Sequence, residues 1–551
     1  MRVRIEFRSA DAVDDTRASS PGVRAVLLGD GSESHRSAEC MSNATIVEYD
    51  LHRRRLRIRT SIVGLPPVFL YKEPSRVVLA SDLWSLRCWP GVSLAFDPHA
   101  VRDLCRIGYP VGFRTLFAGI SVVPGGSVVE VALNGQVTVR RAWRMPEAAP
   151  EESWEAYTDF QARLFRDVVR GIDLRDSFLS LTAGLDTRTI LAALLAEGKS
   201  VPAVTMSWKN LSLDARTARD LCRAYGIPHE IIRFDERFTA EFPGHALAAS
   251  RLSGGLAGVG QATEVAFYHR IGGKWKARLS GNLGNQVGRG GVEQVSLRNG
   301  DLAMLGEGVV SSGAVAEASD HWFYGDDRRG APLERLFLLQ SETLFSSIGN
   351  YCIGHHFVVQ RSPYASRRLI EALARAPSDA RCRAPRSIFR IRCDDLHHRF
   401  LGYPAHRSFQ RKSISAVGGY VAQCPINWGW RVRGGVSPKR TVAGLLTFLD
   451  ALAASQGLDR SWFGRALETV RITGRYDFRQ TRKWCSREFL RDTLLRREIR
   501  ERGLLNVPRI ETMLDEHFAG RRDHHANLML ALDLSCAQQV FLDGPSGPHI
   551  P

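Results

Sequence analysis

Residues 177–187 read Ser-Phe-Leu-Ser-Leu-Thr-Ala-Gly-Leu-Asp-Thr, a largely apolar run followed at once by small, hydroxyl-bearing and acidic residues. The first part predicts a buried strand over residues 177–181, and the change of composition after it predicts a loop. Residues 186–197 then predict a helix that ends at Gly198. We therefore expect a strand, a loop and a helix, which is the start of a βαβ unit.

The segments that follow continue this alternation. A second strand is expected over residues 201–207, a helix over residues 213–225 that ends at Gly226, and a third strand over residues 229–232. Strands that alternate with helices of this length predict right-handed crossovers and a parallel sheet covered on both faces. The expected fold class is α/β. From about residue 443 to the end the pattern is nearly all helical.

The residues before position 143 have a different pattern. Runs of β-branched and aromatic residues at 44–49, 68–71 and 76–80 are bounded by glycine, proline and charged residues, and they predict strands. Pro146 and Pro150, with acidic neighbours, cannot join a helix interior or a central strand. We therefore divide the chain into a sheet domain (1–145), a linker (146–152) and a second domain (153–551).

Composition limits the class of protein. Of 551 residues, 44% are hydrophobic and 24% are charged, as in ordinary globular proteins. No run approaches the ~20 apolar residues that span a bilayer, and the first residues do not resemble a secretory signal. The ten cysteines are dispersed, with no Cys-x-x-Cys pair. We therefore expect a cytoplasmic protein with no membrane partner.

The charge balance is strongly basic. The formal net charge is +17, which would suit a polyanionic partner such as nucleic acid. However, the excess consists mainly of arginines spread over the whole chain, and a genomic codon bias explains them equally well. The composition therefore does not favour a nucleic-acid partner.

The loop after the first strand of the second domain has the features of a phosphate site. In an open parallel sheet, ligands bind beyond the carboxyl ends of the strands. Ala183 and Gly184 let backbone N–H groups approach an anion, Thr182 and Thr187 add hydroxyls, and the positive end of the following helix faces the ligand. Asp186 fits as an acceptor for Mg²⁺ carried by the phosphates. An ordinary turn with Asp186 as a helix cap explains the same residues, so both interpretations stay open at this point.

These residues also carry a family resemblance. Residues 181–187 resemble the Ser-Gly-Gly-x-Asp-Ser pyrophosphate loop of the ATP pyrophosphatases and, more narrowly, of the asparagine synthetases. Further segments are similar to that family in the same order, at residues 59–71, 80–83, 108–125, 141–143, 214–229, 279–286, 411–413 and 504–542. The resemblance implies a degenerate, Ntn-hydrolase-like αββα sandwich, followed by a parallel-sheet HUP domain of the ATP-pyrophosphatase kind with a helical C-terminal part.

The resemblance implies a ligase reaction that uses ATP and Mg²⁺. A substrate carboxylate attacks the α-phosphate, pyrophosphate leaves, and an amine or ammonia displaces AMP to form an amide, as in asparagine biosynthesis. The carboxylate would belong to a small molecule or a peptide. The oligomeric state of the protein stays open, and a homodimer is one of the possibilities.

The same resemblance assigns roles to particular positions. Main-chain groups would line the adenosine at Leu181, Met206, Ser207, Ser280 and Gly281. Pyrophosphate and Mg²⁺ would be held by Thr182, Ala183, Gly184, Asp186 and Thr187. Lys412 would be the catalytic cation that neutralises charge at the α-phosphate. A solvated surface lysine is the alternative interpretation of Lys412.

The chain departs from the family at three places. Arg2 stands where glutamine-hydrolysing members expose a cysteine, which predicts an N-terminal domain without glutaminase activity, as in β-lactam synthetases and lasso-peptide cyclases. Asn285 and Gln286 replace an Asp-Glu pair, and each lost carboxylate forfeits roughly 4 kcal/mol of attraction to a cation at 4 Å and an effective dielectric near 20. Ala183 replaces the first glycine of the loop.

These departures leave several functions open. The leading hypothesis is an amide-forming ligase without glutamine hydrolysis. The alternatives are a catalytically impaired binding module, an intramolecular cyclase of the β-lactam synthetase or lasso-peptide type, and a tRNA-modifying member of the wider superfamily. Against the tRNA-modifying alternative, this chain has no paired thiols for sulfur transfer.

Overall fold

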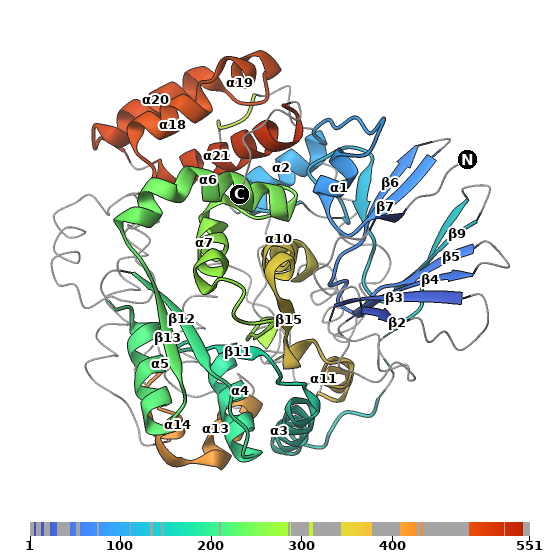
Figure 1. The fold of residues 1–551 in the computed structure, drawn as a ribbon, viewed down its shortest axis with the longest axis vertical. Helices are drawn as coiled ribbons and strands as arrows, with labels where there is room; N and C mark the ends of the chain where they lie inside the picture. Colours follow the sequence, from blue (N-terminus) through green and yellow to red (C-terminus); the bar gives the residue numbers. More distant parts are fainter. Residues whose placement is uncertain are drawn as a thin grey trace.

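The computed structural model describes residues 5–6, 13–15, 23–29, 44–50, 55–73, 76–110, 112–132, 136–144, 146, 148–208, 211–284, 287, 308–311, 343–376, 408–426, 431–433, 484–522 and 524–543. These residues form a mixed α/β structure with three sheets. Figure 1 shows the two N-terminal sheets to one side of the parallel sheet and its helices.

The N-terminal part of the chain forms two sheets. The four-stranded sheet has the order β1 (Ile5–Glu6), β7 (Arg76–Ala80), β6 (Phe69–Glu73), β8 (Ile120–Val122). The six-stranded sheet has the order β10 (Val137–Arg141), β9 (Ser127–Val131), β5 (Arg55–Arg59), β4 (Ala44–Asp50), β3 (Val23–Gly29), β2 (Val13–Asp15). The strands expected at 44–49, 68–71 and 76–80 are confirmed as β4, β6 and β7.

The two sheets pack against each other through alternate residues of their strands. Their shared apolar cluster includes Leu56, Ile58, Val77, Leu79, Val129 and Val131. Helices α1 (Leu83–Arg87) and α2 (Pro98–Ile107) instead contribute to a larger core that continues into the rest of the chain. These are the described helices before residue 145, so the two β layers are shown, but the complete αββα arrangement is not.

The connection between the two parts has no regular structure where it is described, as its prolines predict. Trp143 is buried, and its indole Nε1–H donates to Glu371 Oε1 at 2.9 Å. The Glu151 N–H donates to the Arg375 carbonyl at 2.8 Å. These contacts fix the connection to α11 (Arg367–Ala372) and the short helix η7 (Leu373–Arg375).

The second part is built on a parallel sheet. Its five strands have the order β13 (His229–Phe234), β12 (Ala203–Trp208), β11 (Ser177–Ser180), β14 (Ala277–Leu279), β15 (Val359–Arg361). The three strands expected from the sequence are therefore confirmed. The chain runs outward from β11 to β13 and then returns to form β14 on the other side of β11. The direction of winding thus reverses between β11 and β14, which is the topological switch point of the sheet.

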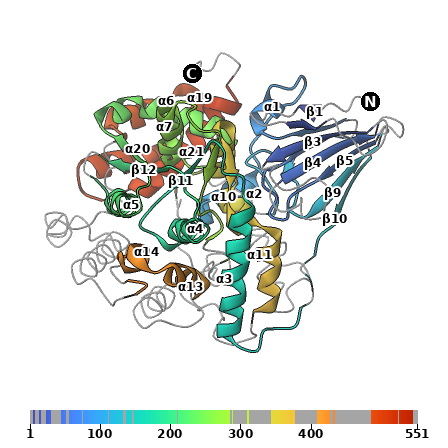
Figure 2. The same ribbon diagram turned by 60° about the horizontal axis from the view of Figure 1, so that its bottom comes forward.

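Helices cover both faces of this sheet. The expected helices are confirmed as α4 (Leu185–Ala196) and α5 (Leu213–Ala224), which end before Gly198 and Gly226 with φ of +63° and +65°. They lie on one face together with α3 (Trp154–Gly171), α13 (Ser408–Val417) and α14 (Gly419–Gln423). The other face carries α7 (Ala262–Ile271) and α10 (Thr343–Phe357), as Figures 1 and 2 show.

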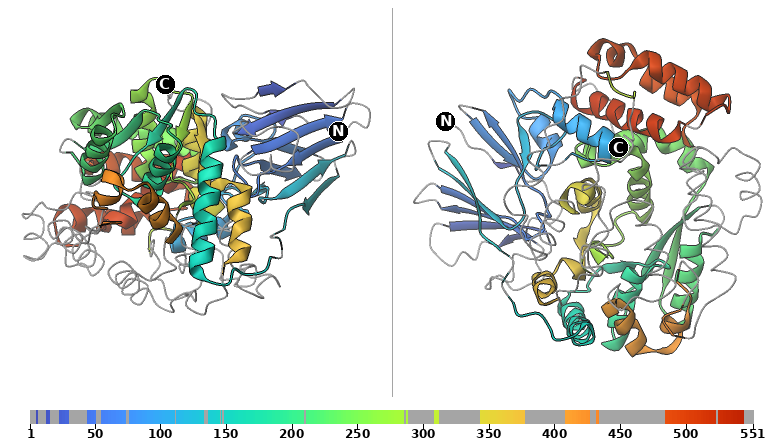
Figure 3. Two further views of the ribbon diagram at one scale, coloured as in Figure 1. Left: turned by 90° about the horizontal axis from the view of Figure 1, so that it is seen from below. Right: turned by 180° about the vertical axis from the view of Figure 1, so that it is seen from behind.

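The last described part of the chain is helical, as expected. It comprises α18 (Arg487–Leu494), α19 (Arg497–Arg502), α20 (Val507–Phe518) and α21 (His525–Phe541). Helix α21 packs on α6 (Glu236–Ser253), and Figure 3 shows this group at one end of the molecule. The short helices η2 (Val259–Gln261) and η6 (Pro363–Ala365) complete the described elements. No described helix is both long and apolar enough to cross a membrane.

Candidate functional site

Two loops meet at the switch point of the parallel sheet. One follows β11 and leads into α4, and the other follows β14. A Cβ atom at Gly281 would lie 2.7 Å from Asp186 Cβ, and one at Gly284 would lie 2.7 Å from both Asp186 Cγ and Oδ1. A side chain at either position would force Asp186 or the second loop to move. The structure therefore brings Asp186 and Gly281 together, with the Asp186 carboxyl against the second loop.

The loop after β11 is shaped by its own hydroxyls. The Thr182 N–H donates to Thr187 Oγ1 at 3.1 Å, and the Gly184 N–H donates to Thr182 Oγ1 at 3.2 Å. Gly184 precedes α4 with an extended backbone and provides no side-chain cap. Because the first N–H groups of a helix have no partner within the helix, this uncapped end favours an anion.

A carboxylate lies against the same loop. The N–H of Ala183, itself buried, donates to Asp214 Oδ1 at 2.8 Å. Asp214 belongs to the first turn of α5. It therefore holds a donor that a phosphate oxygen would otherwise use. Sequence reasoning placed Asp214 in a segment that resembles the family but gave it no role.

Residues from two distant segments hold Asp186, one through its carboxylate and one through its backbone carbonyl. Gln410 Nε2 donates to Asp186 Oδ1 at 2.7 Å, and the Tyr364 hydroxyl donates to the Asp186 carbonyl at 2.9 Å. Gln410 is fully buried, and its Oε1 has no hydrogen-bond partner among the described residues. Gln410 and Tyr364 were missed by the sequence analysis, because nothing in the sequence links them to Asp186.

A buried arginine lies beneath the loop. Arg188 has no exposed surface, and its Nη2 donates to the carbonyls of Ala183 at 3.1 Å and Pro425 at 3.2 Å. Since guanidinium stays charged in proteins, a fixed positive charge lies directly under the loop. The available sequence signal was a single basic residue in the otherwise uncharged part of helix α4 that follows Asp186.

The main-chain groups expected around adenosine lie at the ends of the strands. The Leu181 carbonyl accepts from Thr205 Oγ1 at 2.8 Å, and the Ser280 N–H donates to the last residue of β15 at 2.9 Å. Met206 is half-buried and Ser207 is buried near the end of β12. All four residues thus lie at or near strand ends, and two of these main-chain groups already have internal partners, so a role around adenosine stays a prediction.

A cavity of about 220 Å³ lies between the second loop, α10 and the segment that joins β5 to β6. It is lined by Val63, Leu65, Ser280, Gly281, Asn282, Leu283, Ser347, Asn350, Tyr351, Gln360, Ser362 and Ala365. The Ser280 hydroxyl is buried and has no partner in the described part of the chain. Leu283 has a φ of +68°, a strained conformation for a leucine. The cavity therefore lies beside the switch point, with an unpartnered hydroxyl in the described part of its wall.

Lys412 is not brought to this site. Its ammonium pairs with Asp159 of α3. Lys412 follows Gln410 by two positions on α13, so the two side chains point about 200° apart around the helix axis. Since Gln410 meets Asp186, the ammonium lies on another face of α13.

Asn285 and Gln286 lie outside the described residues, so the expectations about them stay predictions. In the part of the chain that the structure describes, no group of three or more His, Cys, Asp or Glu side chains could hold a metal ion.

No protein-family model matches this chain, and no curated protein sequence matches it.

Proposed function

We propose that this chain is an ATP-dependent ligase, similar to asparagine synthetases, that adenylates a carboxylate, releases pyrophosphate and forms an amide without hydrolysing glutamine. One observation carries the proposal: the loops after β11 and β14 meet at the switch point of a parallel sheet, with Asp186 between them. We extend the proposal to the finer fold, with the parallel sheet as a HUP domain of the ATP-pyrophosphatase kind and the two N-terminal sheets as a degenerate Ntn-hydrolase-like sandwich.

The loop and its surroundings suit a chain of phosphates. The uncapped first turn of α4 provides backbone N–H donors, and Thr182 and Thr187 provide hydroxyls. The Arg188 guanidinium beneath the loop favours negative charge there. Preorganised donors of this kind act where charge develops in the transition state, and removal of one costs about 10²–10³ in rate.

The residues present also fit a magnesium ion. Mg²⁺ at nucleotide sites is bound through one or two carboxylates together with phosphate oxygens, and it neutralises phosphate charge there. Asp186 supplies a carboxylate, and the unpartnered Gln410 Oε1 belongs to the amide that holds it. Lys412, paired with Asp159, is left out of this proposal.

The reaction balances with these groups. A carboxylate oxygen of the substrate attacks the α-phosphorus, the bond to the bridging oxygen breaks, and pyrophosphate leaves with that oxygen. The amine nitrogen then attacks the acyl carbon, AMP leaves, and the amine loses a proton. The 220 Å³ cavity beside the second loop would hold the acid, with the Ser280 hydroxyl as a donor to it.

Pyrophosphate release tests this proposal. The purified chain, ATP and Mg²⁺ are incubated with a panel of carboxylic acids and with hydroxylamine, which traps acyl adenylates as hydroxamates. We expect acid-dependent release of pyrophosphate and a matching hydroxamate. Asp186→Asn is expected to reduce release about a hundredfold or more without a change in the thermal unfolding curve. Asp167→Asn, on an exposed part of α3, is the matched control. An unchanged rate in Asp186→Asn would remove Asp186 from the site.

A second candidate function is a binding module that keeps the fold without catalysis. It is favoured by the internal partners of the loop: Asp214 holds the Ala183 N–H, and Gln410 holds the Asp186 carboxylate. The neutral Asn285 and Gln286, in place of two carboxylates, also favour a binding module. No ATP binding by calorimetry, together with no pyrophosphate release for any acid, would support it.

An intramolecular cyclase differs from the ligase only in its substrate. From a substrate that carries its own amine, a product that has lost one water molecule, formed with no amine added, would favour cyclisation.

A further inference from the structure

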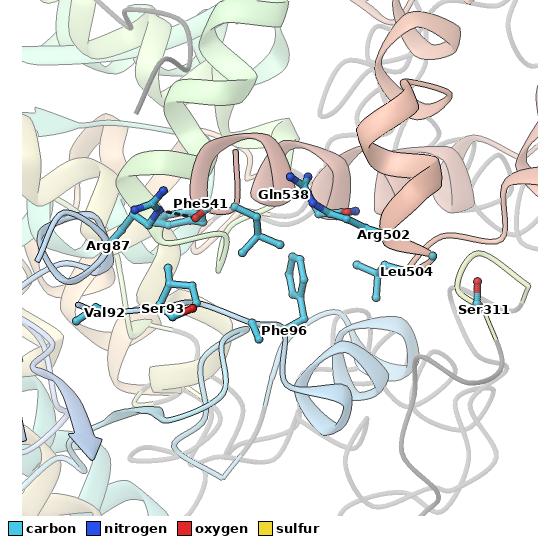
Figure 4. A pocket seen from close by; sticks show the side chains of 13 residues that line it. Arg87, Val92, Ser93, Phe96, Ser311, Arg502, Leu504, Gln538 and Phe541 are labelled. Carbon is cyan, nitrogen blue, oxygen red and sulfur yellow. Dashed lines mark hydrogen bonds between the residues drawn. The ribbon is translucent and has the colours of Figure 1, made fainter. Parts of the chain in front are cut away.

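A second and larger cavity lies where the N-terminal part meets the C-terminal helices. Its volume is about 800 Å³, within the usual range of small-molecule sites. Its lining residues are Arg87, Val92, Ser93, Leu94, Ala95, Phe96, Ser311, Arg502, Gly503, Leu504, Gln538, Phe541 and Leu542. The cavity shares none of them with the two loops at the switch point. Figure 4 shows Phe96 between Arg87 at one end and Ser311 at the other.

The cavity wall is apolar and polar in about equal parts, and it carries two arginines. Arg87 is held in place by the end of α21, where its Nε donates to the Phe541 carbonyl at 2.6 Å and its Nη2 to the Asp543 carbonyl at 3.4 Å. Arg502, at the end of α19, pairs with the Asp543 carboxylate. Two guanidinium groups and one carboxylate leave a net positive charge beside the apolar part of the wall. An anion with an apolar body complements this combination.

Gln538 gives the cavity a more specific feature. Its side chain is fully buried on α21, yet neither Nε2 nor Oε1 has a hydrogen-bond partner among the described residues. Buried amides are nearly always hydrogen-bonded, so this one needs a partner from outside the described chain. A ligand that offers one acceptor and one donor side by side, as an amide does, would satisfy both atoms.

We propose that this cavity is a binding site for a small amphipathic carboxylate that carries an internal amide, of the N-acyl amino acid class. The carboxylate pairs with Arg502 and Arg87, the amide meets Gln538, and the acyl chain lies along Phe96, Leu504 and Phe541. Since the ligand would contact both the 87–96 segment and the C-terminal helices, its binding joins the two parts of the molecule. This site goes beyond the proposed ligase function and does not depend on it.

Isothermal calorimetry with the full chain, in the absence of ATP, tests the site with three matched probes. N-octanoylglycine has all the required groups, undecanoate has the same chain length without the amide, and N-octanoylglycinamide has no charge. We expect saturable binding of N-octanoylglycine, about tenfold or more tighter than that of either other probe. Equal affinities for N-octanoylglycine and undecanoate would contradict the role of Gln538. Equal affinities for the charged and neutral probes would contradict the role of the arginines.

Variants locate the binding. Arg502→Gln is expected to weaken N-octanoylglycine about tenfold, while Arg500→Gln, on the same helix but outside the cavity, changes the affinity less than about twofold. Gln538→Leu tests the amide, but because Gln538 is fully buried, its replacement also changes the packing of α21. Ser93→Trp therefore serves as a second variant, because Ser93 is exposed and its replacement fills the cavity without touching a charge. Binding that survives Ser93→Trp and Arg502→Gln unchanged would overturn the proposal.

Discussion

Replacement of Gly284 by alanine tests how closely the two loops must approach. The added Cβ would lie 2.7 Å from Asp186 Cγ and Oδ1, whereas ordinary contacts begin at 3.4 Å. Asp186 or the second loop must therefore move by about 3.4 − 2.7 = 0.7 Å. Overpacking of this kind costs about 1–3 kcal/mol of folding free energy. The fold should survive that cost.

The functional effect of Gly284→Ala should be larger than its effect on stability. A displacement near 1 Å of a catalytic group costs on the order of 100-fold in rate. We expect the affinity for Mg-ATP to fall and any acid-dependent pyrophosphate release to drop about 100-fold. Calorimetry with Mg-ATP measures the first effect without knowledge of the acid. Gly260→Ala is the matched control, because a Cβ there would meet nothing within 4 Å.

Two outcomes would refute this reasoning. If Gly284→Ala bound Mg-ATP as the unchanged chain does, the approach of the second loop to Asp186 would be irrelevant to nucleotide binding. If Gly260→Ala lost binding to the same extent, the effect would not be specific to the switch point.

Three further predictions follow from single carboxyl and amide groups. Asp214→Asn should bind ATP about tenfold tighter, because it removes a negative charge next to the phosphates while its amide oxygen can still accept from the Ala183 N–H. Calorimetry measures the affinity, and weaker binding would instead make Asp214 a ligand of the metal. Asn285→Asp should strengthen the Mg²⁺ dependence of ATP binding, and an unchanged dependence would mean that this residue is not near the metal. Burial raises the pKa of the Asp533 carboxyl from 3.8 to about 7, so between these values the folded state keeps a proton that the unfolded state releases. The contribution of this group to the free energy of unfolding should therefore be complete below about pH 4 and should be lost as the pH rises through 7, by up to roughly 4 kcal/mol. Urea unfolding at several pH values should show this loss in the unchanged chain but not in Asp533→Asn, and equal pH slopes would contradict it.

The part of the fold that was predictable depends on local signals. The strands and helices between residues 177 and 234 were found because apolar periodicity and the helix-ending Gly198 and Gly226 act over a few residues. The partner order of the strands and the packing of α1 and α2 depend on contacts between distant residues. Local sequence patterns do not indicate which distant residues will be in contact.

The site divides in the same way. Asp186 and its loop were predicted because they are one contiguous segment between a strand and a helix. Asp214 and Gln410 were not assigned to the site, because they contact the loop across 31 and 224 positions in the sequence. The position of Lys412 could not be predicted for a related reason: the face that a residue of α13 turns toward α4 is decided by tertiary packing, which places Gln410 against Asp186.

The most direct test of the central claim is a crystal structure of the chain with Mg²⁺ and a non-hydrolysable ATP analogue. The account predicts the β- and γ-phosphates against the first turn of α4, the Asp214 carboxylate displaced from the Ala183 N–H, and magnesium within coordination distance of Asp186. An analogue bound elsewhere, or a loop that keeps its Asp214 contact with no phosphate beside it, would contradict the account.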